Sequence, residues 1–188
     1  MIKQCFKNID FRILWGAGCM TGIARAMEFL ALSLFALQEL GLPYLVTIIF
    51  AARMLPMSLL GIVIGTISER ISPISVIKFI YTLSNISTGI AILLVFTGNF
   101  NVIFAFLLAF INGITWVVDL AVRRRVLVDN IDQKLLSSSL AMETLSNNAT
   151  RLIGPLCAGS LYAFVGLAGI FCVQFFMYIL ALGFIIKF

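Results

Sequence analysis

Residues 22–34 read GIARAMEFLALSL, an apolar segment that carries two charges, Arg25 and Glu28, in its interior. A soluble helix would turn such charges toward water, but the rest of this chain offers little surface of that kind. Hydrophobic residues make up 62% of the sequence and charged residues 11%, which is typical of membrane proteins. We therefore predict that residues 22–34 belong to a membrane-spanning helix whose two charges face protein or an internal cavity.

Six apolar segments are each about as long as the roughly 20 residues that cross a bilayer as a helix. They cover residues 13–37, 43–66, 75–97, 101–122, 135–164 and 167–186. Because these segments use nearly the whole chain, no separate soluble domain of ordinary size is expected. The sequence predicts an all-α integral membrane protein with a single domain of six transmembrane helices over residues 1–188.

The distribution of basic residues predicts the orientation, because Lys and Arg are enriched in cytoplasmic connections. They occur before the first segment, after the second, after the fourth and at the end of the chain, whereas the connections at 38–43, 98–101 and 165–167 contain none. The chain is therefore predicted to lie in the cell membrane with both termini on the cytoplasmic side. The net charge of +5 is explained by this bias, so no nucleic-acid partner is predicted.

Sequence features of enzymes and metal sites are missing. The chain has no histidine, and its four cysteines form no Cys-x-x-Cys pair, so the commonest metal ligands are absent or isolated. No Ser/His, His/Glu or paired-aspartate arrangement suggests intramembrane catalysis. We predict a protein that is not an enzyme and that has no cofactor and no metal.

The connection at 123–134, RRRVLVDNIDQK, is the longest polar segment after the N-terminus. We predict that it runs along the membrane surface. Asp132 or Asn130 is the expected N-cap of the fifth helix, because both side chains can accept hydrogen bonds from the first free backbone amides.

Six ionisable side chains lie inside the predicted helices: Arg25, Glu28, Arg53, Asp119, Glu143 and Arg151. An ionisable group facing lipid costs at least about 2–3 kcal/mol, so these groups are expected to face protein or water. One interpretation is structural pairing, since Arg25 and Glu28 are three residues apart and Asp119 and Arg123 are four apart. The other is a polar cavity, and both stay open at this point.

Helical periodicity favours a cavity. At about 100° per residue, polar and small residues form one face on the first, fourth and fifth segments. These faces comprise Gly18, Gly22 and Arg25; Asn112, Trp116, Asp119 and Arg123; and Ser139, Glu143, Asn147, Thr150 and Gly154, with Asn148 and Arg151 at the edge. The first, second, fourth and fifth segments are therefore expected to line a polar space. The third and sixth are expected to support them, since the sixth has only Gln174 as a polar side chain in its middle.

Residues 65–75, GTISERISPIS, resemble the loop between the second and third spans of major facilitator superfamily transporters. Gly65, Glu69 and Arg70 stand at the Gly, acidic and Arg positions of that motif, and Ser72 stands where the family has a second Gly.

Residues 150–159, TRLIGPLCAG, are similar to the Gly-Pro motif of the fifth span in antiporters of the same superfamily. Gly154, Pro155 and Gly159 match, and Ala158 stands where another Gly is usual. Together with the opening NIDFRILWGAG and AARMLP at 51–56, the chain resembles the N-terminal six-helix half of such a transporter, particularly of the drug and siderophore efflux branch.

The resemblance implies a fold of two six-helix halves related by an axis normal to the membrane. The predicted six helices correspond to one half, so we expect a second copy to supply the other in a parallel C2 homodimer. Small residues allow close helix contact, and the expected interface residues are Gly61, Gly154, Pro155 and Ala158. Packing within one subunit is an equally open interpretation of these residues.

The implied function is secondary active efflux of a small molecule by alternating access. Arg25 and Arg53 are the candidate cations for an anionic group, and Glu28 and Glu143 are candidate proton sites. The remaining candidate substrate contacts are Asn112, Trp116, Asn147, Asn148 and Arg151, and the candidate gating residues are Gly65, Glu69, Arg70 and Asp119. Two alternatives stay open: one subunit of a heteromeric transporter, or a transporter-derived membrane scaffold.

Overall fold

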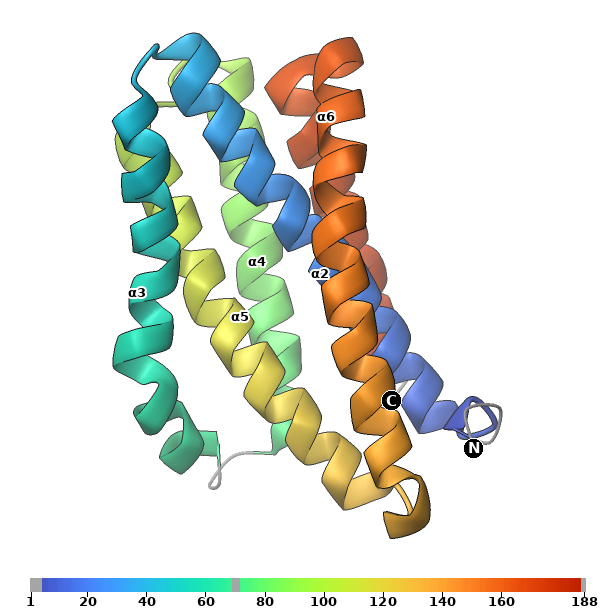
Figure 1. The fold of residues 1–188 in the computed structure, drawn as a ribbon. Coiled ribbons are helices and arrows are strands. Elements are labelled where there is room, and N and C mark those ends of the chain that lie inside the picture. The colour runs from blue at the N-terminus through green and yellow to red at the C-terminus, as the bar shows by residue number, and fades with distance from the viewer. Residues whose placement is uncertain (1–4, 69–71, 187–188) are drawn as a thin grey trace.

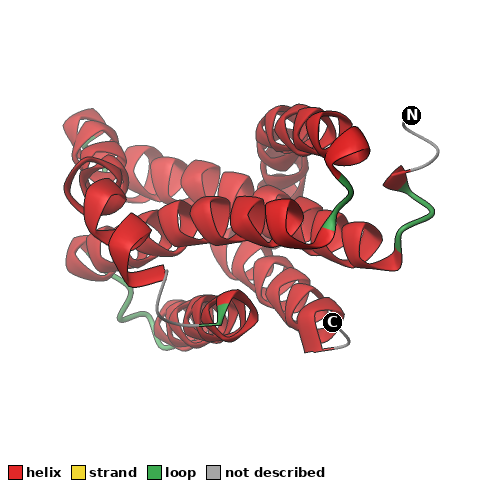
Figure 2. Ribbon diagram, turned by 90° about the horizontal axis from the view of Figure 1, so that it is seen from below, coloured by secondary structure: helices red, strands yellow, loops and turns green. Residues whose placement is uncertain are grey.

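A computed structural model describes residues 5–68 and 72–186, and the side chains of residue 39 and of residues 60–68 lie outside this description. The elements are α2 (Ile9–Leu34), the π-helical turn η1 (Phe35–Glu39), α3 (Pro43–Ser68), α4 (Pro73–Phe96), α5 (Val102–Asn130) and α6 (Gln133–Ile186). The described part of the chain contains helices and short connections but no strand (Figure 2). The predicted all-α class is confirmed.

Four helices in the described part are long and apolar enough to cross a membrane: Ile9–Gln38, Pro73–Phe96, Val102–Asn130 and Gln133–Ile186. The segment Pro43–Leu59 of α3 is a shorter apolar helix. The bounds of α2, α3 and α4 follow the predicted segments closely, because each of these apolar runs is bordered by turn-forming residues that a helix does not accommodate in its interior. Length and composition alone do not confirm six separate spans.

Helix α6 is divided by Gly166, whose backbone is not helical (φ 64°, ψ −164°). A straight helix of this length would extend about 80 Å, far beyond the hydrocarbon thickness of about 30 Å. Figure 1 shows the red C-terminal part of α6 turning back at the upper end of the bundle. Gly41 and Gly98, in the two other predicted external connections, also have positive φ, a conformation that glycine adopts without strain.

Asparagine side chains cap the N-termini of α2 and α5. Asn8 accepts hydrogen bonds from the amides of Asp10 (2.9 Å) and Phe11 (3.3 Å) ahead of α2. Asn101 does the same for Ile103 (3.0 Å) and Phe104 (3.2 Å) ahead of α5. Each cap satisfies amides that have no partner inside the first helical turn.

The prediction of a surface connection over 123–134 is wrong, because α5 continues through Asn130. Val122, Val126 and Leu127 are buried on one face of this extension, so the apolar periodicity of the helix does not stop at the arginines. Asp132 directly precedes α6, and its carbonyl accepts from the amides of residues 135 (2.8 Å) and 136 (3.0 Å). Residue 132 thus stands at the expected cap position, but these contacts are made by its backbone carbonyl, and the predicted side-chain cap stays a prediction.

Two apolar clusters form the core. The first includes Met27, Leu32, Ile49, Leu108 and Phe171, and the second includes Phe11, Leu14, Ile77, Val126 and Ile185. On both α2 and α5, buried polar residues occupy the turns between the two clusters. The molecule therefore holds a polar layer between two apolar layers. In Figure 1, α3 and the orange segment of α6 flank α2 and α5, while α4 lies behind them.

Candidate functional site

Asp119 is the centre of the buried charges. Its carboxylate accepts a hydrogen bond from Arg25 Nη2 and another from the Tyr81 hydroxyl at 2.9 Å. Arg123 Nε forms an ion pair with Asp119 Oδ1 at 3.2 Å. The Asp119 side chain has no exposed surface, so α2, α4 and α5 are joined by one carboxylate. The predicted Asp119–Arg123 pair is present.

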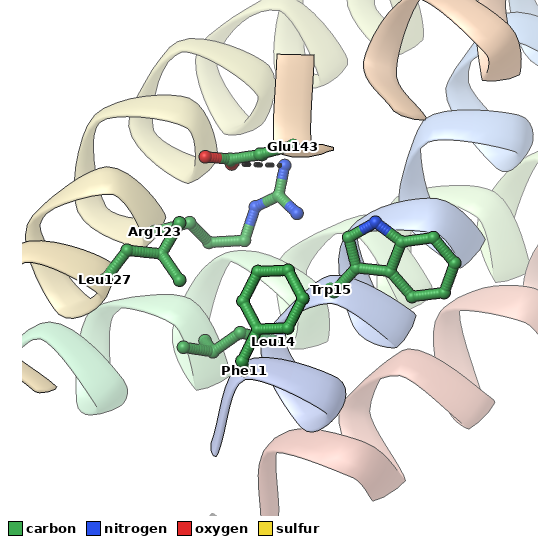
Figure 3. A pocket seen from close by; sticks show the side chains of 6 residues that line it. All are labelled: Phe11, Leu14, Trp15, Arg123, Leu127 and Glu143. Atoms are coloured by element: carbon green, nitrogen blue, oxygen red, sulfur yellow. Dashed lines mark ion pairs between the residues drawn. The ribbon is translucent and has the colours of Figure 1, made fainter. Parts of the chain in front are cut away.

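Arg123 extends this network to α6. Its Nη2 lies 3.3 Å from Glu143 Oε1, and Figure 3 shows the two side chains facing each other across the helices. The pocket beside them is lined by Phe11, Leu14, Trp15 and Leu127 and has a volume of only about 10 Å³, about one water molecule. Glu143 therefore takes part in an ion pair between helices, in a space too small for a substrate.

Glu28 has different neighbours from Arg25. Its fully buried carboxylate accepts hydrogen bonds from the side-chain amides of Asn112 and Gln174. The Tyr178 hydroxyl donates to Asn112 Oδ1 at 3.1 Å. Among the described residues Glu28 forms no ion pair, so the interpretation in which Arg25 and Glu28 pair with each other does not hold. The reason is that each side chain reaches a different position of α5, Asp119 and Asn112, two helical turns apart.

A cleft of about 520 Å³ opens between α2, α3, α5 and the first segment of α6. It is lined by Gly22, Arg25, Ala26, Phe29, Phe50, Arg53, Met54, Trp116, Leu120, Arg124, Thr144, Asn147, Asn148, Thr150, Arg151 and Pro155. Such a volume lies in the range of small-molecule sites. The four helices are the ones whose sequences predicted a polar face.

Trp116 is the aromatic centre of the cleft. The guanidinium carbon of Arg53 lies 5.4 Å from the Trp116 ring centroid, and that of Arg151 lies 5.2 Å from it. Arg53 also lies over Phe29 at 5.6 Å and donates to the Arg25 carbonyl oxygen at 3.0 Å. These distances are within the range of cation–π contacts, so the two arginines from opposite walls are held at one aromatic ring.

The structure separates the predicted substrate residues into two groups. Those that line the cleft are Arg25, Arg53, Trp116, Asn147, Asn148 and Arg151. Glu28 and Asn112 lie behind it in the amide network, and Glu143 lies beside Arg123. Of the predicted gating residues, Asp119 is buried at the ion-pair centre. Gly65 is in the part of α3 without described side chains, and Glu69 and Arg70 fall outside the described residues.

The predicted interface residues lie in different environments. A Cβ atom on Gly154 would be 2.4 Å from Ala26 Cβ and 3.0 Å from the Ile23 carbonyl oxygen, so Gly154 packs on α2 within the subunit. Ala158 is buried in the first apolar cluster. Both residues are therefore packed inside the single bundle, and their assignment to a dimer interface stays a prediction. Pro155 borders the cleft, and the surroundings of Gly61 lie outside the described part of the structure.

Sequence reasoning missed three side chains of the buried network: Tyr81, Gln174 and Tyr178. Gln174 and Tyr178 are four residues apart, which places them on one helix face, and this spacing could have indicated that the sixth segment contributes to the site. Tyr81 belongs to a polar stripe on α4 with Ser84, Asn85 and Thr88, all buried. The third and sixth predicted segments therefore supply polar partners as well as support.

The chain matches the family of transmembrane secretion effectors over residues 4–188. No curated protein and no solved structure matches it significantly.

Proposed function

Because the chain belongs to the transmembrane secretion effector family, a family of major-facilitator-type transporters, we propose that it exports a small molecule through the cleft between α2, α3, α5 and α6. The observation that carries this proposal is the pair of arginines held at Trp116 in a cleft of about 520 Å³. A membrane scaffold gains nothing from arginines at this depth, since intramembrane ionisable groups are costly and usually functional.

We take α3 and both segments of α6 as membrane crossings, which gives six with α2, α4 and α5. The connections without basic residues then lie outside the cell, and the N-terminal end of α2 and the C-terminal end of α6 lie inside. Both of these ends are in the lower half of Figure 1.

The cleft needs a cover within the membrane, because Arg151 is exposed in the single bundle and a lipid-facing arginine is unfavourable. We propose that a second copy supplies the cover in a parallel C2 dimer, with the cleft between the two bundles. Alternating access then consists of the bundles rocking about the cleft, which opens first to one side and then to the other. A separate six-helix partner is the competing arrangement.

Exposed apolar side chains on α3 and α6, two of the four helices that border the cleft, support such a contact. On α3, Leu55 is 43% exposed, and on α6, Leu152 is 72% exposed. In a parallel dimer each α3 would meet the partner's α6. Cysteines at positions 55 and 152 of co-expressed, otherwise cysteine-free copies should crosslink, and native mass measurement should give two copies per particle. A monomer by both methods contradicts the homodimer.

Proton coupling is assigned to Glu28 in preference to Glu143. Glu143 has Arg123 as a permanent cationic partner at 3.3 Å, whereas Glu28 is held by neutral amides only. A buried carboxylate without a cation is unfavourable in its charged form, so binding and release of a proton at Glu28 can follow its access to water.

The role of the connection between α3 and α4 is proposed from the family resemblance. Gly65, Glu69 and Arg70 would act with the Asp119 network as a cytoplasmic gate. Glu69→Gln should shift the inward–outward balance by about 1–3 kcal/mol and leave substrate affinity in the competent state unchanged.

The transport proposal is tested by the accumulation of fluorescent small molecules of negative, neutral and positive charge in cells. Cells with the native protein should retain less of at least one compound than cells with Trp116→Ala at equal membrane expression. Equal retention of every compound by the two strains contradicts export through this cleft.

A further inference from the structure

The buried charges of the described residues balance one another. The cations Arg25, Arg53 and Arg123 stand against the anions Glu28, Asp119 and Glu143, all of them buried. This balance is expected in a low-dielectric interior, where an uncompensated charge is unfavourable. The network behind the cleft therefore has no charge left over for a ligand.

The wall of the cleft is not balanced. Among the described residues, its lining includes Arg124 and Arg151 in addition to Arg25 and Arg53, and no Asp or Glu. Arg124 and Arg151 are exposed, and neither forms an ion pair within the described part of the chain. The cleft consequently presents two positive charges that no described acidic residue neutralises by an ion pair.

The other lining residues define the remainder of a ligand. Phe29, Phe50, Met54 and Trp116 supply apolar and aromatic surface, while Asn147, Asn148 and Thr144 supply neutral hydrogen-bonding groups on α6. Arg151 stands at the Trp116 ring, so an anionic group bound by Arg151 places its adjoining atoms against that ring. Guanidinium groups bind carboxylates and other oxyanions in a two-pronged geometry.

From this arrangement we propose that the cleft binds small organic anions with a flat apolar body, with Arg151 holding the anionic group and Trp116 contacting the body. This inference deepens the proposed function and rests on it for the identity of the site. It concerns the charge class of the substrate, which the family assignment leaves open.

Binding is measured by the fluorescence of Trp116. The chain has only two tryptophans, so Trp15→Phe leaves Trp116 as the single one. The protein is placed in discs of zwitterionic lipid, so that no anionic headgroup competes for the cleft. Three probes with one ring system are titrated: naphthalene-2-carboxylate, its neutral carboxamide and the corresponding methylammonium. Calorimetry on the protein with both tryptophans gives an independent ranking of the same probes.

The carboxylate should bind about tenfold or more tightly than the carboxamide, and the ammonium should bind weakest. Arg151→Gln should remove most of the difference between carboxylate and carboxamide while leaving the carboxamide affinity unchanged. Arg12→Gln is the matched control, because Arg12 is an exposed cation that does not line the cleft, and it should preserve the ranking.

Equal or tighter binding of the carboxamide or the ammonium overturns the proposal, and so does the absence of binding by all three probes. Export of only neutral or cationic compounds from cells would sink the anion proposal and leave transport intact. Binding of the carboxylate without any export would contradict the transport proposal and leave the anion proposal intact.

Discussion

Arg25 on α2 donates to Asp119 on α5, whereas Glu28, one helical turn further along α2, is held by the amides of Asn112 and Gln174. The two charges therefore belong to different networks. Arg25 is part of an ion-pair cluster that joins helices and borders the cleft, and the Glu28 carboxylate is held by neutral side chains behind it.

Asp119→Asn should destabilise the protein strongly, because it leaves Arg25 and Arg123 buried without their shared anion. A loss of about 3–5 kcal/mol in unfolding free energy is expected for breaking a buried ion pair from one side. The measurement is detergent-denaturant unfolding in mixed micelles. Adding Arg25→Met to Asp119→Asn should recover part of the loss; a double variant whose loss equals the sum of the two single losses argues against direct coupling.

Glu28→Gln should preserve folding and abolish the pH dependence of transport. Glutamine has nearly the same volume and still accepts a hydrogen bond, but it cannot exchange a proton. The measurement is the export rate across a range of pH for whichever compound responds in cells. Glu143→Gln is the matched control and should keep the pH dependence. If export by the Glu28→Gln variant still depends on pH and export by the Glu143→Gln variant does not, proton coupling belongs to Glu143.

Gly154→Ala should destabilise the single subunit, since the added Cβ would lie 2.4 Å from Ala26 Cβ. Overpacking of this kind costs about 1–3 kcal/mol. Gly159→Ala on the same helix is the control, because its Cβ would meet only Leu30 Cδ2 at 3.7 Å, an ordinary contact. Unfolding free energies that are unchanged in both variants would place Gly154 away from α2.

Gly166→Ala should destabilise the protein only through the strained backbone conformation that it imposes on residue 166. No atom lies within 4 Å of the added Cβ, but φ is +64°, where an L-residue loses about 1–2 kcal/mol. Gly183 also has open space around it and lies inside the helical part of α6. Gly183→Ala should therefore be neutral or stabilising by about 0.5–1 kcal/mol. An equal effect of the two substitutions on unfolding would contradict the turn at Gly166.

The sequence was sufficient to predict the all-α class and the turns between helices, because the apolar runs are long and each predicted external turn contains a glycine with positive φ. It did not predict that α5 continues through Asn130. It also predicted which four helices carry a polar face, since Trp116 and its neighbours repeat at the helical period. It did not predict the partner of Arg25. Spacing along one helix shows that Glu28 is near, but the rotation of α2 against α5 decides that Asp119 is the partner.

Small residues were ambiguous for a related reason. A stripe such as that of Gly154 and Ala158 has the same sequence pattern whether it packs on a helix of its own subunit or on a second copy. Only the packing of α6 on α2 distinguishes the two cases. Gln174 was not predicted as a site residue, because a single polar residue in an apolar segment shows no helical periodicity. The periodicity becomes visible only when Tyr178, four residues later, is counted as polar too.

The most direct test of transport through the cleft is the access of reagents to Asn148, an exposed residue of its wall. In a cysteine-free protein, Asn148→Cys should react with a membrane-impermeant maleimide added from either side of the membrane, because the cleft opens to each side in turn. Asn99→Cys should react only from outside and Asp129→Cys only from inside. Reaction of Asn148→Cys from one side alone, or from neither, while both controls react as expected, would contradict alternating access through this cleft.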